Sequence, residues 1–323
     1  LELYGSEKVH SYVGFEPSGE PQDSLVLNVT DSGQTKPHNP FTNSGSIVLS
    51  SILFPEKSNS ERLEEIQKWY KAASLTTPTV NEECYNTVKN NSERHHAMSY
   101  LLKQYDALPG DISTVLDFYF QTISLEWTLD EISLFGSTIA NNGKNPITGE
   151  QIFSPETMRD AISMMYCCGM NTYSGEFGFS AGIPAKASTS GILLSLVPNI
   201  LSIASFSPKL DEHDSSIRGS TFLRELSSQF NFHIFEGTGG FQKINPTLKL
   251  SQEKIDTATL LSFAAAGAEP EIVAFLDEHG LDVNIADYDM RTMAHVSAAE
   301  QHHDVIRFLQ SREANFLAKD RWG

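Results

Sequence analysis

Apolar side chains recur at helical spacing between Leu116 and Pro155. The positions that repeat are Leu116, Phe118, Phe120, Ile123, Leu125, Ile132, Phe135 and Ile139. This spacing predicts two helices that each bury one face. Thr128 followed by Glu131 is a capping-box pattern that begins the second helix, and Asn142-Gly143 is a typical helix stop. Ser154-Pro155 then supplies the N-cap and the first residue of a third helix, which leaves a turn in between.

The pattern continues on both sides of this block. Further helices are predicted over residues 61–73, 156–168 and 220–232, and residues 81–105 predict one helix or a broken pair. Residues 46–54 are mostly apolar and fit either a helix or a strand. Two β-branched or apolar runs, residues 191–197 and 200–206, are divided by Pro198-Asn199, which predicts a β-hairpin.

The tail of the chain repeats itself with a period of 33 residues. Thr259-Leu260-Leu261 recurs as Thr292-Met293-Ala294, and the apolar pair Ile272-Val273 recurs as Val305-Ile306. The order Thr-x-x-His-x-x-Ala, which begins at Thr292, is typical of ankyrin repeats. The sequence therefore predicts about two ankyrin repeats and the start of a third. Such repeats need neighbours to cover their apolar faces, so we expect further repeats or docking on the first domain.

The composition of the 323 residues excludes several classes of protein. Hydrophobic residues make up 40%, which is enough for a large core, yet no apolar run approaches the roughly 18 residues of a membrane span. With 41 acidic against 23 basic side chains the net charge is −18, which argues against binding of nucleic acid. The three cysteines, Cys84, Cys167 and Cys168, are too few for a disulfide scaffold and suit a reducing compartment.

Metal and thiol sites are not expected. His95-His96 and His302-His303 are adjacent pairs, and neighbours on a helix cannot face one metal ion together, so we predict that these histidines are solvated. Cys167-Cys168 has no C-x-x-C partner and follows a helical apolar run, which favours two buried small side chains. No metal and no cofactor is predicted.

Two segments carry residues that could act in acyl transfer. Ser251 and Lys254 have the spacing of a serine nucleophile and a lysine base on a helix, but their place at the start of the repeats favours a helix N-cap. Lys186 lies among small residues just before the predicted hairpin, where its positive charge and nearby backbone N–H groups could face an oxyanion. A polar turn without function is the other interpretation of residues 184–191.

A set of short motifs resembles the glutaminase family. In chain order the motifs are Val9-His10-Ser11-Tyr12-Val13-Gly14, Glu16-Pro17-Ser18-Gly19, residues 36–45, Leu116-Asp117-Phe118-Tyr119-Phe120-Gln121, Pro146-Ile147-Thr148-Gly149-Glu150, Ser154-Pro155-Glu156, Cys168-Gly169-Met170 and Pro184-Ala185-Lys186. Their order and approximate spacing hold over nearly the whole chain. The chain is therefore identified as a member of this family of serine-dependent amidohydrolases, and its repeat tail is similar to that of the animal enzymes.

The resemblance implies an α/β (α+β) fold like that of serine β-lactamases and DD-peptidases, with an antiparallel sheet and a helical lobe. We expect this domain, lacking its N-terminal part, over residues 1–236, a linker over residues 237–250 and all-α ankyrin repeats over residues 251–323. The implied reaction is hydrolysis of L-glutamine to L-glutamate and ammonia through a Ser–Lys pair and an acyl-enzyme. Animal members are mitochondrial homotetramers that respond to inorganic phosphate, so the same location, assembly and activator are expected, together with a protein partner of the repeats.

Four residues carry over from the family's site. Asn43 and Glu93 match substrate-binding residues, and the Glu93 carboxylate is the group that pairs the ammonium of the substrate. Tyr119 matches a pocket tyrosine that reaches the nucleophile or the substrate, so it is assigned to both catalysis and binding. Lys186 matches the lysine of the family's Lys-Ser-Gly strand and is assigned to catalysis.

Other positions depart from the family's pattern. The segment with the nucleophile, Gln-Ser-x-x-Lys-Pro, is expected upstream of Leu1. His95 falls where a substrate-binding Asn belongs, and Asn171 replaces the catalytic tyrosine, although an amide cannot shuttle a proton as a phenol does. Tyr173 could take that place only if the loop shifted, and Lys-Ser-Gly has become Lys186-Ala187-Ser188. We therefore predict no significant activity for this chain alone and a weakened enzyme in a longer form.

A non-catalytic role is the alternative. Asn43, Glu93 and Tyr119 would support binding of glutamine or glutamate without turnover, or assembly with active subunits. A third interpretation is an interaction module of the ankyrin type on a relic domain, in which residues 259–323 bind a partner by themselves.

Overall fold

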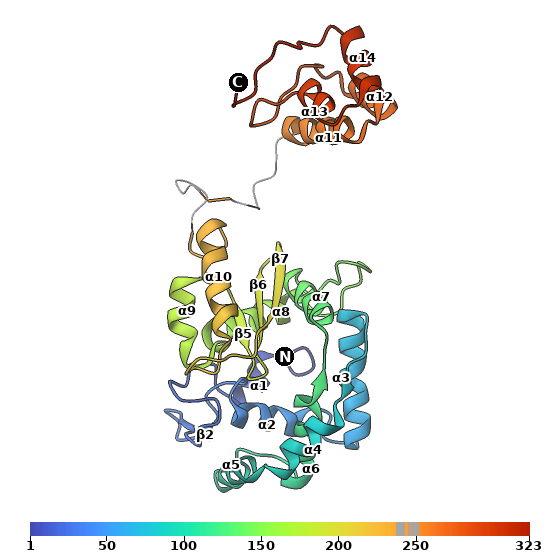
Figure 1. The fold of residues 1–323 in the computed structure, drawn as a ribbon. Coiled ribbons are helices and arrows are strands. Elements are labelled where there is room, and N and C mark those ends of the chain that lie inside the picture. The colour runs from blue at the N-terminus through green and yellow to red at the C-terminus, as the bar shows by residue number, and fades with distance from the viewer. Residues whose placement is uncertain (237–242, 245, 247–251) are drawn as a thin grey trace. The chain divides into compact units, whose positions relative to one another are not determined.

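The computed structural model describes residues 1–236, 243, 244, 246 and 252–323. The chain divides into two compact units, Leu1–Pro246 and Thr247–Gly323 (Figure 1). Most of the predicted linker, residues 237–250, lies outside the described residues, as does Ser251. In the part of the chain that is described, no helix is long and apolar enough to span a membrane.

The first unit combines helices with short antiparallel strands. Its helices are α1 (Gly5–Tyr12), α2 (Asn43–Ile52), α3 (Asn59–Ser74), α4 (Glu82–Asn90), α5 (Glu93–Gln104), α6 (Ile112–Ile123), α7 (Leu129–Ala140), α8 (Pro155–Cys168), η1 (Asn171–Tyr173), α9 (Ser174–Ser180) and α10 (Ile217–Gln229). Its strands are β1 (Asn28–Val29), β2 (Thr35–Lys36), β3 (Thr79–Val80), β4 (Leu125–Glu126), β5 (Ala185–Ala187), β6 (Ile192–Val197) and β7 (Leu201–Phe206).

The main sheet is antiparallel with the strand order β5-β6-β7. The predicted hairpin is confirmed, because β6 and β7 pair from Ile192 with Phe206 to Val197 with Leu201. Asn199 in the connecting turn has φ +62°, a left-handed conformation that Asn adopts more readily than most residues.

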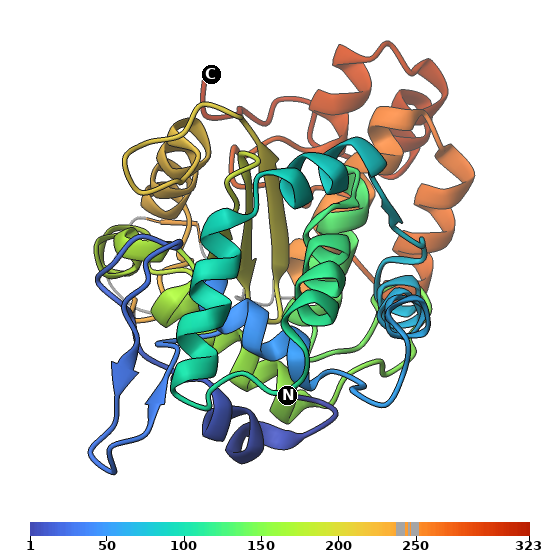
Figure 2. The ribbon, with the colours of Figure 1, turned by 90° about the horizontal axis from the view of Figure 1, so that it is seen from below.

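Helices α7 and α10 cover opposite faces of this sheet (Figures 1 and 2). Gly136 of α7 lies so close to Leu194 of β6 that an added Cβ would approach the leucine side chain to 2.7 Å. Gly219 of α10 lies against Leu193 in the same way, at 3.1 Å. Neighbouring residues of a strand point to opposite faces, so the two glycines allow close approach of one helix on each side.

A helical lobe packs beside the sheet. Its core is built by apolar residues of α1, α2, α5 and α6 and of the loops between them, namely Val9, Val13, Ile47, Val48, Met98, Leu102, Leu108, Val115, Leu116, Tyr119 and Phe120. The Arg62 guanidinium on α3 stacks on the Phe118 ring at 3.8 Å and donates to the carbonyl oxygens of Ser50 and, at 2.8 Å, Leu53. Arg62 thereby satisfies carbonyl groups at the end of α2. The antiparallel sheet and the helical lobe are as predicted.

The block from Leu116 to Pro155 folds as its pattern predicts. Helix α7 begins with a capping box between Thr128 and Glu131, and α8 begins after the N-cap Ser154 with a proline in its first turn. Helix α7 ends before Asn142 and Gly143, which have φ +55° and +81°. The turn that follows is held by Asn145, whose buried amide donates to the Ala72 carbonyl oxygen on α3 at 2.9 Å.

For three predicted segments, the structure decides between alternatives or moves the bounds of the helix. Residues 46–54, which fit a helix or a strand, form most of α2, and residues 81–105 form the broken pair α4 and α5. The helix predicted over residues 220–232 begins earlier, at Ile217. Ser216 is its N-cap and accepts from the Gly219 N–H at 3.2 Å, a start signal that precedes the apolar pattern.

Predictions for the paired histidines and cysteines are partly wrong. His95, His96 and His302 are half-buried rather than solvated. The His95 ring lies against Tyr119 and Phe120 of α6, and His302 Nε2 lies 2.8 Å from the Ala265 carbonyl oxygen. Cys168 is buried as predicted, whereas Cys167 is exposed. Consecutive residues of a helix point about 100° apart, so a pair at the end of α8 divides between core and solvent.

The second unit contains two helix pairs, α11 (Gln252–Ala266) with α12 (Glu269–His279) and α13 (Met293–Ala299) with α14 (His303–Ser311). The pairs share one core of Leu260, Ala264, Ile272, Leu276, Met293, Ala294, Val305 and Leu309. Thr292 and His295 form a capping box at the start of α13, with the Thr292 N–H 3.2 Å from His295 Nδ1.

Candidate active site

A hydrogen bond joins two of the predicted site residues directly. Asn43 is the first residue of α2, after the N-cap Thr42, and Tyr119 lies buried in the middle of α6. The Tyr119 hydroxyl donates to Asn43 Oδ1 at 3.3 Å. Burial raises the pKa of Tyr119 above its ordinary value, so the hydroxyl keeps its proton at neutral pH. Gly45 lets α2 start here, since an added Cβ would lie 1.9 Å from the Asn39 carbonyl oxygen.

Gln22 is a third member of this cluster that the sequence did not reveal. Its side-chain amide Nε2 donates to Asn43 Oδ1 at 3.3 Å, and its backbone carbonyl accepts from the Asn43 N–H at 3.0 Å. Gln22 lies in a loop without helix or strand between α1 and β1, so no periodicity marks it. Its contact with Asn43 across 21 residues appears only in the folded chain.

Helix α5 supplies the next wall of the cluster. The His95 ring lies 5.7 Å from the Tyr119 ring and 5.4 Å, edge to face, from the Phe120 ring. Burial, followed by the neighbouring charge of His96, lowers the pKa of His95, so this ring is neutral at pH 7. Glu93 is exposed at the start of α5 and has no ion-pair or hydrogen-bond partner among the described residues.

Lys186 approaches from the sheet rather than from the helical lobe. It lies on β5, and its Nζ is 5.5 Å from the centre of the Phe41 ring, two residues before Asn43. The ammonium group donates to the Ala187 carbonyl oxygen. Burial lowers the pKa of Lys186 to about 8. Lys186 therefore borders the loop that leads into α2, without a hydrogen bond to Asn43 or Tyr119.

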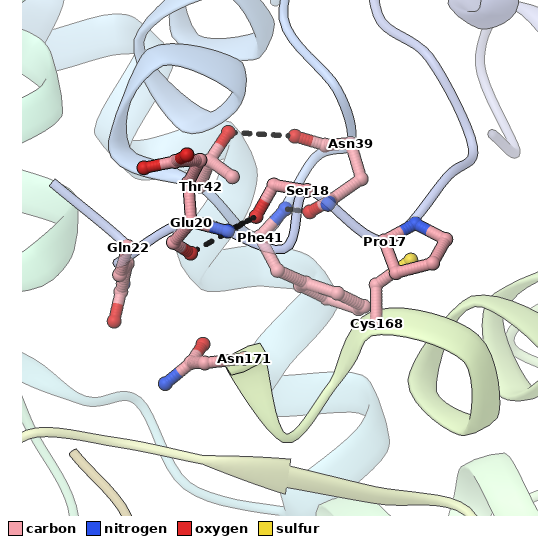
Figure 3. A pocket seen from close by; sticks show the side chains of 9 residues that line it. All are labelled: Pro17, Ser18, Glu20, Gln22, Asn39, Phe41, Thr42, Cys168 and Asn171. Atoms are coloured by element: carbon pink, nitrogen blue, oxygen red, sulfur yellow. Dashed lines mark hydrogen bonds between the residues drawn. The ribbon is translucent and has the colours of Figure 1, made fainter. Parts of the chain in front are cut away.

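A small hollow lies between the loop that precedes α2 and the segment around the end of α8 (Figure 3). Its lining residues are Pro17, Ser18, Glu20, Gln22, Asn39, Phe41, Thr42, Cys168 and Asn171. In Figure 3 the amides of Gln22 and Asn171 lie on one side of the Phe41 ring, with Pro17 and Cys168 on the other. The room inside this hollow is far smaller than the ~300–1,000 Å³ of a typical ligand pocket.

Asn171, rather than Tyr173, faces this hollow. Asn171 has φ +53°, and its amide donates to the His213 carbonyl oxygen at 3.3 Å. The Tyr173 ring is buried beside Met170 and Phe177 and stacks on the His213 ring with centres 5.2 Å apart. Tyr173 is absent from the lining of the hollow.

The described residues were also examined for a metal-ion site and for a reactive thiol near the hollow. Among them, no group of three or more His, Cys, Asp or Glu side chains could hold a metal ion. Cys168 lines the hollow, but burial raises the pKa of its thiol to about 12, so it is not a thiolate at neutral pH.

Comparison with known proteins identifies relatives over the first unit and beyond. A sequence profile of the glutaminase family matches residues 1–235. The chain is 36% identical over 324 residues to the mitochondrial liver isoform of glutaminase from Rattus norvegicus, an alignment that covers 99% of this chain and 53% of the relative. The chain thus spans about half the length of the animal relatives it matches.

Solved structures agree with the sequence comparison. The crystal structure of a Bacillus glutaminase in 4.3 M NaCl has a TM-score of 0.68 and 29% identity, over 72% of this chain and 78% of that chain. A second neighbour is the covalent complex of a Bacillus subtilis glutaminase with 5-oxo-L-norleucine, formed from 6-diazo-5-oxo-L-norleucine. It has a TM-score of 0.64 and 27% identity, over 72% of this chain and 76% of that chain.

Proposed function

The chain belongs to the glutaminase family, and we propose that the full-length protein hydrolyses the carboxamide of L-glutamine to give L-glutamate and ammonia. The observation that carries this proposal is the hydrogen bond from Tyr119 to Asn43 within the region that the family profile matches. Asn43 Oδ1 is occupied by Tyr119 and Gln22, whereas Nδ2 makes no hydrogen bond in the described part of the chain. Nδ2 is thus a free donor for a carboxylate or carbonyl oxygen of the substrate.

The other predicted residues take complementary roles in this proposal. Glu93 offers an exposed carboxylate without a partner among the described residues, which suits the ammonium of an amino acid. Lys186 offers a positive charge at the sheet side, where charge develops on an oxygen during acyl transfer. A ligand between them would have its ammonium toward α5 and its carboxamide toward β5.

We place the nucleophile in a Ser–Lys pair. The serine oxygen attacks the carboxamide carbon and gives its proton to the lysine, which passes it to the leaving nitrogen. The C–N bond breaks, ammonia leaves, and water then cleaves the acyl ester to glutamate and restores the serine hydroxyl. Among the described residues of the first unit, no serine hydroxyl is hydrogen-bonded to a lysine ammonium, so the proposal takes the pair from the remainder of the full-length protein. A relative that forms a covalent complex with 5-oxo-L-norleucine supports a covalent intermediate.

We further propose that this catalysis is weak. Asn171 lines the hollow where the family resemblance places a tyrosine, and an amide cannot relay the proton. Ammonia release from L-glutamine by the purified full-length protein tests the activity itself. If calorimetry shows that glutamine or glutamate binds while no ammonia is released, the non-catalytic alternative replaces the proposal.

Asn171→Tyr tests whether Asn171 is the cause of the weak catalysis. Restoring the phenol is expected to raise kcat by about 10-fold or more with a smaller change in KM. The matched control is Asn142→Tyr, because Asn142 also has a positive φ, +55°, but is exposed and away from the hollow. If kcat of Asn171→Tyr equals kcat of the Asn142→Tyr control, then Asn171 does not occupy the place of the catalytic tyrosine.

The remaining proposals concern the whole protein. The two helix pairs and the capping box at Thr292 support ankyrin repeats over residues 251–323 and a linker over residues 237–250 that separates them from the domain at residues 1–236. The rat relative is named as mitochondrial, which supports the same location here. Homotetramer formation, activation by inorganic phosphate and a protein partner of the repeats are expectations from the family resemblance.

A further inference from the structure

The short helix η1 carries Asn171, and a single residue far along the chain contacts the side chains of all three of its residues. That residue is His213, in the loop between β7 and α10. Its carbonyl oxygen accepts from the Asn171 amide at 3.3 Å, and its ring Nδ1 lies 2.8 Å from the Thr172 hydroxyl. Its ring also stacks on the Tyr173 ring, with centres 5.2 Å apart and 14° between the planes. His213 therefore holds η1 through a backbone group, a ring nitrogen and a ring face.

The loop that carries His213 is closed by its own hydrogen bonds. At its neck Leu210 and Ser216 form an antiparallel bridge, and the Asp211 N–H donates to the Ser215 carbonyl oxygen at 2.9 Å. At its tip the Asp211 carboxylate accepts from the backbone N–H groups of His213 at 2.9 Å and of Ser215 at 3.0 Å. Such a carboxylate turn fixes the backbone of a short loop. Since Ser216 is also the N-cap of α10, His213 is anchored to the start of that helix.

The backbone of η1 is fixed independently of His213. Ser174, which follows η1, accepts from the Met170 N–H at 3.1 Å and donates to the Asn171 carbonyl oxygen at 2.8 Å. Asn171 itself is in the left-handed region, with φ +53°. These backbone bonds do not set the direction of the Asn171 side chain. That direction depends on the hydrogen bond to His213 and on the contacts that His213 makes with the next two residues.

We propose that His213 is a positioning residue of the candidate site, which fixes the side chain at position 171 in the wall of the hollow. This inference rests on the proposed function. Asn171 lines the hollow together with Gln22 and Phe41 (Figure 3), whereas His213 does not line it. His213 thus acts through position 171 and not on a ligand. A side chain that takes part in proton transfer must be held in a narrow range of positions by the residues behind it.

Hydrogen exchange of the full-length protein tests the positioning directly. His213→Ala removes both ring contacts and should speed amide exchange in residues 169–177 about 10-fold, because η1 then opens more often. His213→Phe restores the stacking on Tyr173, so its exchange should be only about 3-fold faster, and Thr172→Val should match it. His279→Ala is the matched control. The His279 ring also stacks on an aromatic ring, that of Phe275 at 4.2 Å, but lies in the second unit and should leave residues 169–177 unchanged.

A double-mutant cycle tests whether the positioning matters for catalysis. Asn171→Tyr is expected to raise kcat for glutamine about 10-fold or more while His213 is present. In a chain that also carries His213→Ala, this gain should fall to about 3-fold or less, because the phenol is no longer held in place. KM should change less than kcat. A residue that only stabilises the fold would lower kcat by the same factor with and without the phenol. Asn171→Tyr combined with His279→Ala is the control and should keep the full gain.

The outcomes separate this inference from the proposed function. If the wild-type protein releases ammonia and His213→Ala leaves exchange in residues 169–177 unchanged, the inference is wrong and the proposed function stands. The inference is also wrong if exchange becomes faster but the gain from Asn171→Tyr is the same with and without His213. If neither the wild-type protein nor Asn171→Tyr releases ammonia from glutamine, the proposed function fails and the inference falls with it.

Discussion

Asp117 and Tyr119 lie two residues apart on α6, yet their polar surroundings differ sharply. The Asp117 carboxylate accepts four hydrogen bonds, from the Tyr85 hydroxyl at 2.5 Å, the Gln121 amide at 2.8 Å, the Lys89 ammonium at 2.9 Å and the Asn59 amide at 3.0 Å. Burial acts to raise the pKa of Asp117, but the hydrogen bonds and the charge of Lys89 outweigh it and bring the pKa to about 2. Every donor comes from α3, α4 or α6, so this cluster ties the helical lobe together.

The cluster around Tyr119 is incomplete by comparison. Asn43 Oδ1 is satisfied, but Gln22 Oε1 and His95 Nδ1 have no partners. Lys186 on β5 has a backbone carbonyl oxygen and an aromatic ring beside its ammonium group, where Lys89 has the Asp117 carboxylate. The comparison teaches that the saturated cluster contributes to stability, whereas the polar groups without hydrogen-bond partners lower it.

Of the variants considered, Lys186→Met should change the free energy of unfolding most. It tests whether a buried charge without a carboxylate partner lowers stability. The pKa of Lys186 is about 8 in the folded chain against 10.5 ordinarily, so at pH 7 both states carry the charge and the folded state carries its burial cost. Removing it should raise the free energy of unfolding at pH 7 by about 2–3 kcal/mol and lower turnover of glutamine. Urea denaturation gives the stability, and ammonia release gives the activity.

The pH dependence of the free energy of unfolding, measured for the wild-type chain and for Lys186→Met, provides the control. Between pH 8 and 10.5 the unfolded wild-type chain still binds the proton that the folded chain has lost, so wild-type stability should rise with pH across this window. Lys186→Met should lack this rise, and Lys71→Met, at an exposed position on α3, should retain it. A wild-type stability that is flat over this window would contradict burial of the charge.

Asp117→Asn should have the opposite effect. The variant keeps the shape but loses the charge that holds Tyr85 and Lys89, so the free energy of unfolding should fall by about 2 kcal/mol at pH 7. The wild-type contribution is complete above pH 3.8 and is lost as the pH falls toward 2, a dependence that Asp117→Asn should lack. Asp130→Asn, exposed in the first turn of α7, is the matched control, and a loss of glutamine binding without a loss of stability would break the comparison.

Local signals in the sequence predicted most of the elements because their causes are local. The capping box at Thr128, the proline at position 155 and the left-handed turn at Asn199 each depend on a few neighbouring residues. The start of α10 at Ile217 was missed because its signal, Ser216 bonding to Gly219, lies outside the apolar pattern.

Only those residues of the candidate site that lie in motifs of the glutaminase family could be predicted from the sequence. Asn43 and Tyr119 lie in such motifs, and the structure joins them across 76 residues. Gln22 lies outside the short motifs that carry the family resemblance, and His95 stood out only as a departure from it, so their convergence could not be predicted. Contacts between distant segments depend on packing that neither periodicity nor turn chemistry encodes.

Tyr119→Phe tests the cluster around Tyr119, and it should change the free energy of unfolding least of the variants considered. The change removes the donor to Asn43 Oδ1, which Gln22 still satisfies, so stability should change by less than about 1 kcal/mol. The Asn43 amide loses one of the two bonds that orient it, so the Kd for glutamine should rise by about 3-fold and kcat should fall at least as much. Tyr85→Phe is the matched control, because the same chemical change at the saturated cluster removes a bond to Asp117 and should lower stability without changing the Kd. If the two phenylalanine variants change stability and binding in the same proportions, then the two polar clusters of α6 do not differ in role.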